Sequence, residues 1–225
     1  MKFIQDVIQG CRALRREDLI NHVKKLLQNE TLTKEINKRM REFEEKRKSS
    51  WRDLFNELCF CILTANSSAQ MGIKVQNSLG FEGFYYLPEE ELSSRLTNLG
   101  YRYPRVRAKY IVEARKYAKS LEKIVKETDV NRVRDWLVKN IRGIGLKEAS
   151  HFLRNVGFKE IAIIDRHILK ILHEYGLIDE IPRSLTKRKY LEIEKILKEM
   201  AKELNLSPAE LDLYLWFSKT GKVLK

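Results

Sequence analysis

Residues 140–157 have the sequence NIRGIGLKEASHFLRNVG, and they decide how the rest of the chain is interpreted. Gly143 and Gly145 flank Ile144, and residues that favour helices follow at once from Leu146. Glycine allows a tight turn with positive φ and a close approach of other backbone. We therefore expect a corner between two helices, with Ile144 packed inward and Gly145 opening the second helix.

Such a turn is suited to binding an anion. The first N–H groups of a helix lack partners inside it and lie at the positive end of its dipole. A DNA phosphate fits this environment, and the contact carries no base sequence information. An ordinary corner explains Gly-Ile-Gly equally well. The surrounding pattern, with Ala149 after the second glycine, matches the helix-hairpin-helix motif, which non-enzymatic proteins also carry.

Helical periodicity dominates the remainder of the chain and predicts an all-α fold. The last helix has Ser207 as its cap and Pro208 at its first position. Residues 161–165 (IAIID) are the one candidate strand, and a buried connection between helices explains them as well. The predicted helices span residues 2–28, 30–50, 51–65, 68–79, 88–98, 104–124, 129–140, 146–156, 165–175, 186–204 and 207–219.

The composition points to a polyanionic partner. The 225 residues include 44 Lys and Arg against 31 Asp and Glu, a net charge of +13. Released counterions favour the binding of such a chain to nucleic acid, although a merely soluble basic protein has the same excess. We find neither an apolar run of the ~18 residues that a membrane helix needs nor a signal peptide.

The cysteines predict neither disulfides nor a cluster. Cys11, Cys59 and Cys61 are an odd, sparse set and too few for a four-thiolate zinc or iron–sulfur site. Cys59 and Cys61 lie in an apolar run, which favours buried thiols. His151 and His167 have no third ligand at a suitable spacing, so we expect no metal site.

Lys147 and Asp165 stand out when they are taken together. Lys147 follows Gly145 by two positions, and Asp165 lies 18 positions further along. Singly, Lys147 is explained as a surface lysine and Asp165 as the cap of a helix that begins at Arg166.

As a pair, with the hairpin, they resemble the core of the helix-hairpin-helix DNA glycosylase superfamily, which includes endonuclease III and the eukaryotic 8-oxoguanine glycosylases. The string Ile164-Asp165-Arg166-His167 is similar to the superfamily's Val-Asp-x-His. Residues 63–70 (LTANSSAQ) and 99–114 also resemble superfamily segments, although the latter is longer by a few residues. The resemblance covers about residues 50–175.

Within the superfamily the chain is most similar to the archaeal-type second family of 8-oxoguanine glycosylase/lyases. Residues 205–225 contain no iron–sulfur cysteines, no N-terminal β-domain is expected, and the chain ends TGKVLK. This resemblance implies a barrel lobe at 50–160, with the hairpin at 136–156. It also implies a second helical lobe from 1–49 and 161–225.

The resemblance implies a bifunctional enzyme that flips out and excises 8-oxoguanine and then cleaves the strand by β-elimination. Lys147 is the expected nucleophile and forms a Schiff base. Because a carboxylate favours the charged form of a nearby lysine, Asp165 is assigned proton transfer and charge stabilisation instead. The alternatives are an oxidised-pyrimidine glycosylase/lyase of endonuclease III type and a non-catalytic helix-hairpin-helix DNA-binding protein.

The remaining site residues are expected from the resemblance alone. Asn66 is placed in the gap left by the flipped base, and Lys225 helps to tell 8-oxoguanine from guanine. Tyr103 and Trp216 are candidates to sandwich the base, and Asp212 to bind its edge. The competing interpretations are ordinary core packing for Trp216 and a solvated or helix-capping role for Asp212.

The expected partner is double-stranded DNA that contains a damaged base, bound by a monomer. No cofactor and no iron–sulfur cluster are expected, although the hairpin can hold a monovalent cation, as in relatives. We expect a prokaryotic cytoplasmic, nucleoid-associated location.

Overall fold

The computed structural model describes residues 2–225, with side chains from Arg15 onward. The described chain consists of helices and their connections, and no strand occurs within it, which confirms the all-α prediction. It forms two compact units: unit 1 comprises Met1–Met40 with Lys159–Leu224, and unit 2 comprises Arg41–Phe158 with Lys225. The sequence placed these boundaries near residues 50 and 160.

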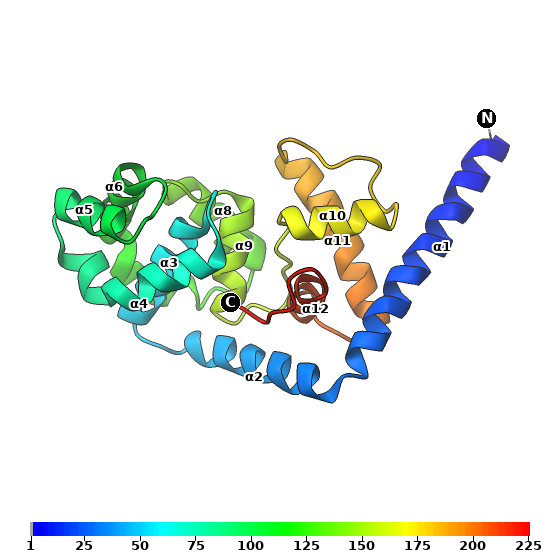
Figure 1. The fold of residues 1–225 in the computed structure, drawn as a ribbon, viewed down its shortest axis with the longest axis horizontal. Coiled ribbons are helices and arrows are strands. Elements are labelled where there is room, and N and C mark those ends of the chain that lie inside the picture. The colour runs from blue at the N-terminus through cyan, green and yellow to red at the C-terminus, as the bar shows by residue number, and fades with distance from the viewer. Residues whose placement is uncertain (1) are drawn as a thin grey trace. The chain divides into compact units, whose positions relative to one another are not determined.

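Unit 2 is built around a central apolar helix, α3 (Trp51–Thr64), whose residues from Leu54 to Thr64 are almost all buried. A helix that is apolar on all sides must be surrounded, and α3 packs against α4, α6, η1, α7 and α9. The elements of this unit after α3 are α4 (Ala69–Tyr86), α5 (Glu89–Asn98), α6 (Pro104–Ala114), the 3₁₀ helix η1 (Arg115–Ser120), α7 (Leu121–Ile124), α8 (Val130–Asn140) and α9 (Leu146–Asn155) (Figure 1).

Unit 1 has α12 (Pro208–Thr220) at its centre, packed against α1 (Lys2–Leu27), α10 (Arg166–Glu174) and α11 (Lys187–Glu203) (Figure 1). Helix α2 (Glu30–Lys46) begins in this unit, where the Tyr214 hydroxyl donates to Thr33 Oγ1 over 3.0 Å. Ser207 caps α12 and Pro208 occupies its first turn, as the sequence predicted.

Two helices differ from the prediction. Helix α4 continues to Tyr86 through a kink at Gly80 (φ 58°, ψ −169°), a conformation that is accessible to glycine and that resembled a helix end in the sequence. The predicted helix at 104–124 is instead α6, η1 and α7 in succession.

The candidate strand at 161–165 is an extended buried connection. The Tyr190 hydroxyl donates to Ala162 O over 3.1 Å and accepts from Ile164 N over 3.2 Å. A side chain thus satisfies backbone groups that a neighbouring strand would otherwise bond.

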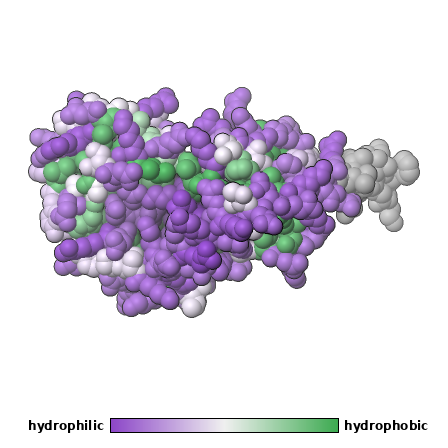
Figure 2. Space-filling model, turned by 60° about the horizontal axis from the view of Figure 1, so that its bottom comes forward, coloured by the Kyte–Doolittle hydropathy of each residue, from purple (hydrophilic) through white to green (hydrophobic). Residues whose placement is uncertain are grey.

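The surface in Figure 2 is mainly hydrophilic, and apolar side chains occur there in small groups. Within residues 2–225, no helix combines the length and apolar character that are needed to cross a membrane.

Candidate active site

The hairpin between α8 and α9 uses its two glycines in different ways. Gly143 has φ +83°, and a Cβ atom there would lie 2.3 Å from the Tyr110 ring. Gly145 has φ −98°, and a Cβ atom there would meet only Glu148 Oε2, at 3.4 Å. The expectation of positive φ is therefore confirmed for Gly143 and wrong for Gly145, where the backbone is in an ordinary conformation. Ile144 is buried between them, as predicted.

Glu148 links the hairpin to Lys147. Its Oε2 accepts from the Gly145 N–H over 3.3 Å, and its Oε1 lies 3.7 Å from Lys147 Nζ. The Gly145 N–H is therefore already bonded in this state and not open to an anion, contrary to the sequence-based expectation. The Lys147 side chain is 28% exposed, so the ammonium is accessible at the start of α9.

Arg107 joins the hairpin to the loop that carries Asn66. This buried guanidinium donates to Ala65 O over 2.8 Å and to Gly143 O over 3.4 Å. Asn66 itself is exposed and has φ +58°. Asparagine tolerates this conformation better than most residues, and an exposed side chain on a fixed left-handed residue suits insertion into a gap.

Lys225 and His151 also belong to the hairpin's unit. Lys225 Nζ lies 2.9 Å from Glu57 Oε2 and 4.3 Å from the centroid of the Phe60 ring. The same ring makes an edge contact with His151, with 5.3 Å between centroids. His151 is one turn after Lys147 on α9, so the helix brings its ring to the face that carries the lysine.

His151 is held neutral. Burial, followed by the positive charges of Arg154 and Lys147, lowers the pKa of its ring well below 6.5. Both ring nitrogens are buried and make no well-formed hydrogen bond in the described part of the chain, although the Lys225 backbone acts on the ring and partly offsets the lowering of its pKa. A neutral imidazole offers one donor and one acceptor, so His151 can bond a polar group that enters the site.

Asp165 lies in unit 1, whereas Lys147 lies in unit 2, so their pairing stays a prediction. Asp165 Oδ1 caps α10 by accepting from His167 N over 2.8 Å and Ile168 N over 2.9 Å. The capping interpretation from the sequence is therefore confirmed. It does not exclude chemistry, because the cap uses one oxygen and holds the other in a fixed orientation.

The candidate base-pocket residues are divided between the units. Trp216 is half-buried and contacts the His167 ring edge-on at 6.0 Å. Asp212 is buried, so it is not the solvated residue that was its competing interpretation. Tyr103 precedes α6 in unit 2 without a side-chain capping bond, and the Arg102 guanidinium lies 5.0 Å from its ring centroid. The proposed sandwich of Tyr103 and Trp216 would need both units, and it stays a prediction.

Among the residues whose side chains are described, no group of three or more His, Cys, Asp or Glu could hold a metal ion. Cys59 and Cys61 are buried free thiols, as predicted, and burial raises the pKa of each well above 9.0. They therefore stay protonated. The side chain of Cys11 lies outside the described residues.

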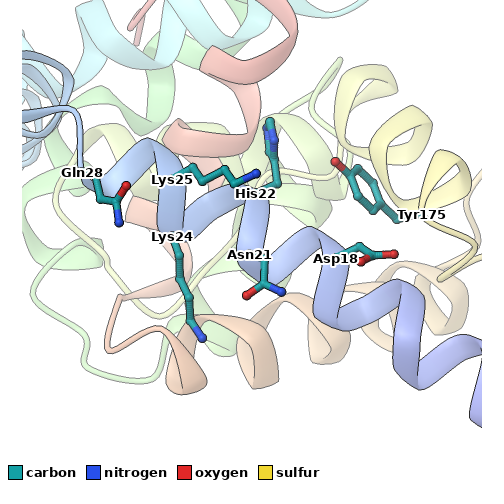
Figure 3. A pocket seen from close by; sticks show the side chains of 7 residues that line it. All are labelled: Asp18, Asn21, His22, Lys24, Lys25, Gln28 and Tyr175. Carbon is teal, nitrogen blue, oxygen red and sulfur yellow. The ribbon is translucent and has the colours of Figure 1, made fainter.

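A separate open pocket of about 550 Å³ lies in unit 1, between α1 and the end of α10. Asp18, His22, Lys25 and Tyr175 are among its lining residues. In Figure 3 His22 and Tyr175 lie toward the same end of the pocket, whereas Lys24 points away from Tyr175. None of the predicted site residues is part of it.

Glu57 and Arg107 were not predicted as site residues from the sequence. Glu57 was visible as a lone carboxylate inside the apolar run LFNELCFCIL, where a charged residue needs a buried partner. Arg107 was one of 44 basic residues, and no local pattern distinguished it.

Comparison with known proteins agrees with this geometry. The family model described as 8-oxoguanine DNA glycosylase matches residues 36–206. A relative from Methanocaldococcus jannaschii, named 8-oxoguanine DNA glycosylase/AP lyase, is 54% identical over 200 residues, which cover 88% of this chain and 96% of the relative. A relative of the same name from Korarchaeum cryptofilum is 50% identical, with 93% and 99% of the two chains covered.

Solved structures give the same result. The crystal structure of the Methanocaldococcus jannaschii 8-oxoguanine glycosylase/lyase in complex with a 15mer DNA containing 8-oxoguanine aligns with a TM-score of 0.89 and 50% identity, covering 92% of this chain and 99% of that one. A trapped endonuclease III–DNA covalent intermediate aligns with a TM-score of 0.54 at 20% identity, with 82% and 84% covered, which shows the shared fold alone. Because the family model and these relatives match most of its length, the chain belongs to the 8-oxoguanine DNA glycosylase family.

Proposed function

We propose that the chain is a DNA glycosylase/AP lyase that excises 8-oxoguanine from duplex DNA and then cleaves the strand. The observation that carries this proposal is the position of Lys147 in the first turn of α9, directly after the hairpin. A backbone phosphate held at the hairpin brings the sugar of a flipped nucleotide to this lysine.

The chemistry needs only side chains of the chain itself. The neutral Lys147 amine attacks C1′ of the sugar, a C–N bond forms, and the bond from C1′ to the base breaks. The base leaves and takes up a proton. The ring opens to a Schiff base, loss of a C2′ proton follows, and β-elimination breaks the bond to the 3′ phosphate.

Asp165 is the proposed partner for proton transfer and for the positive charge that develops on the sugar. Its Oδ1 is engaged in capping α10, which leaves Oδ2 for this role. We further propose Asn66 as the residue that fills the gap. Lys225, His151, Trp216, Asp212 and Tyr103 are proposed around the base.

Borohydride trapping tests this assignment, because borohydride reduces a Schiff base to a stable covalent complex. The wild-type protein should be trapped on duplex DNA with 8-oxoguanine, and the Lys147→Gln variant should not. Lys195→Gln is the matched control, since this lysine is 79% exposed on α11 and pairs with the exposed Glu199. Trapping of the Lys147→Gln protein would overturn the proposal.

The substrate is tested with matched duplexes that carry 8-oxoguanine, thymine glycol or no lesion. We expect strand cleavage chiefly at 8-oxoguanine. Preferential cleavage at thymine glycol would support the endonuclease III-type alternative, and binding without cleavage would support a non-catalytic DNA-binding protein.

A further inference from the structure

The central helix of unit 2 contains a fully buried carboxylate. Glu57 is 0% exposed in the middle of α3, where Leu54, Phe55 and Leu58 are buried and apolar. An ionised carboxylate persists in such a place only when cations and hydrogen-bond donors surround it. Its partners therefore indicate what the residue does.

Glu57 accepts from three side chains. Its Oε1 accepts from Asn155 Nδ2 over 2.8 Å. Its Oε2 lies 2.9 Å from Lys225 Nζ and 3.1 Å from Lys46 Nζ. Burial alone would raise the pKa of Glu57, but the charges of Lys225 and Lys46, with the hydrogen bonds from Lys225 and Asn155, hold it below 4.5. The carboxylate is therefore ionised at neutral pH and attracts both ammonium groups.

Gln76 and Phe60 also contact the Lys225 ammonium, and Gln76 is itself held in place by a hydrogen bond. Gln76 Oε1 accepts from Lys225 Nζ over 2.5 Å, and the amide nitrogen of Gln76 donates to Asn56 O over 2.9 Å. The amide therefore cannot turn over without losing a bond. The Phe60 ring lies 4.3 Å from the ammonium and adds a cation–π contact.

The groups that hold the Lys225 ammonium lie close to the proposed nucleophile, Lys147. The Phe60 ring lies 4.3 Å from the Lys225 ammonium and 5.3 Å, centroid to centroid, from the His151 ring, and His151 is one turn after Lys147 on α9. The ammonium of Lys225 is thus held within the same small region as the nucleophile. Two of its anchors, Glu57 and Gln76, come from α3 and α4, far from Lys225 in the sequence.

We propose that Glu57, with Gln76, is a specificity-determining positioning residue that anchors Lys225 for the discrimination of 8-oxoguanine from guanine. This inference rests on the proposed function and on the assignment of Lys225 to base recognition. The two bases differ by only a few atoms, so the group that reads them must be held in place before the base arrives. Glu57 itself touches no DNA; it acts through Lys225.

The test compares single-turnover excision of 8-oxoguanine and guanine by the wild-type and Glu57→Gln proteins. The neutral amide keeps the shape but removes the charge. We expect the 8-oxoguanine/guanine excision ratio to fall by roughly 10- to 100-fold, which is the range expected from the loss of one charge-assisted hydrogen bond. Cleavage of a pre-formed abasic site should stay within about twofold, because no base is recognised there.

Lys46→Met is the matched control. It removes the other cation from the same Glu57 oxygen, and it leaves the Lys225 contact in place. The excision ratio should stay at the wild-type value. An equal loss in Glu57→Gln and Lys46→Met would mean that Glu57 has only a structural role and would overturn the proposal.

A double-mutant cycle with Lys225→Met shows whether Glu57 acts through Lys225. Once Lys225 is removed, adding Glu57→Gln should lower the ratio no further. Additive losses would overturn the proposal. If Glu57→Gln does not fold, Gln76→Met gives the same comparison from the other anchor, and an unchanged ratio in that variant is also contrary to the proposal.

Failure of the proposed function has a different signature. A wild-type protein that does not excise 8-oxoguanine refutes the function itself. A wild-type protein that excises it selectively, together with a Glu57→Gln protein that is equally selective, refutes only the anchoring role.

Discussion

The two hairpin glycines should respond differently to the same substitution. Gly143 needs positive φ and is closely covered by the Tyr110 ring, whereas Gly145 has an ordinary φ, and a Cβ atom there would meet only Glu148 Oε2, at 3.4 Å. Gly143→Ala should therefore harm folding. Gly145→Ala should leave folding almost intact and act on DNA binding.

The magnitudes follow from these contacts. The left-handed conformation costs an alanine about 1–2 kcal/mol, and displacing the Tyr110 ring adds about 1–3 kcal/mol of overpacking. Gly143→Ala should thus lose about 2–5 kcal/mol, which lowers the Tm of a chain of this size by roughly 5–15 °C. Gly145→Ala changes a helix cap and should lose less than about 1 kcal/mol.

Thermal unfolding followed by circular dichroism measures the first effect, and fluorescence anisotropy with an 8-oxoguanine duplex measures the second. The Gly145 N–H is bonded to Glu148 Oε2, so a phosphate must displace that carboxylate, and in the Gly145→Ala protein the new methyl group lies beside this N–H. Loss of one charge-assisted hydrogen bond predicts roughly tenfold weaker binding. A Gly143→Ala protein with the wild-type Tm, or a Gly145→Ala protein that binds DNA as tightly as the wild type, would refute these expectations.

Substitutions at three further residues test other parts of the site. Asp165→Asn keeps an oxygen to cap α10 and should melt near the wild type while cleavage falls by about 100-fold or more; Asp165→Ala should in addition lose about 1 kcal/mol of stability. Wild-type cleavage by Asp165→Asn would contradict the proton-transfer role. His151 has its pKa lowered by burial and by Arg154, so below pH 6.5 the unfolded chain binds a proton that the folded chain does not. The stability from neutral His151 is thus complete above pH 6.5 and decreases on acidification by at most about 1.4 kcal/mol per pH unit. The Tm difference between pH 7 and pH 5.5 should therefore shrink in His151→Asn, and an unchanged difference argues against the neutral ring. Arg107→Met leaves two carbonyls without their donor and should cost about 2–3 kcal/mol. Arg107→Lys should restore only part of this, because lysine cannot span both acceptors, and full rescue in melting experiments would contradict the bridging role.

The sequence by itself determined the features that depend on near neighbours in the chain. Helix periodicity, the cap of α12 at Ser207 and the turn around Ile144 each involve only a few consecutive residues, so local preferences decide them. The same holds for Asp165 as the cap of α10. Gly80 shows the limit of this approach, because a single glycine kink inside a helix looks like a helix end.

The tertiary structure decided which residues surround the candidate site. Glu57 and Lys225 are 168 positions apart, and Arg107 and Gly143 are 36 apart. No local preference encodes such pairs, because they form only when α3, α4, α6 and α9 have packed. The difference between Gly143 and Gly145 has the same origin: it depends on the Tyr110 ring beside one glycine and on the single ordinary contact with Glu148 at the other. The sequence therefore identified Lys147 as the candidate nucleophile, and only the packing of distant helices identified the residues that hold its surroundings in place.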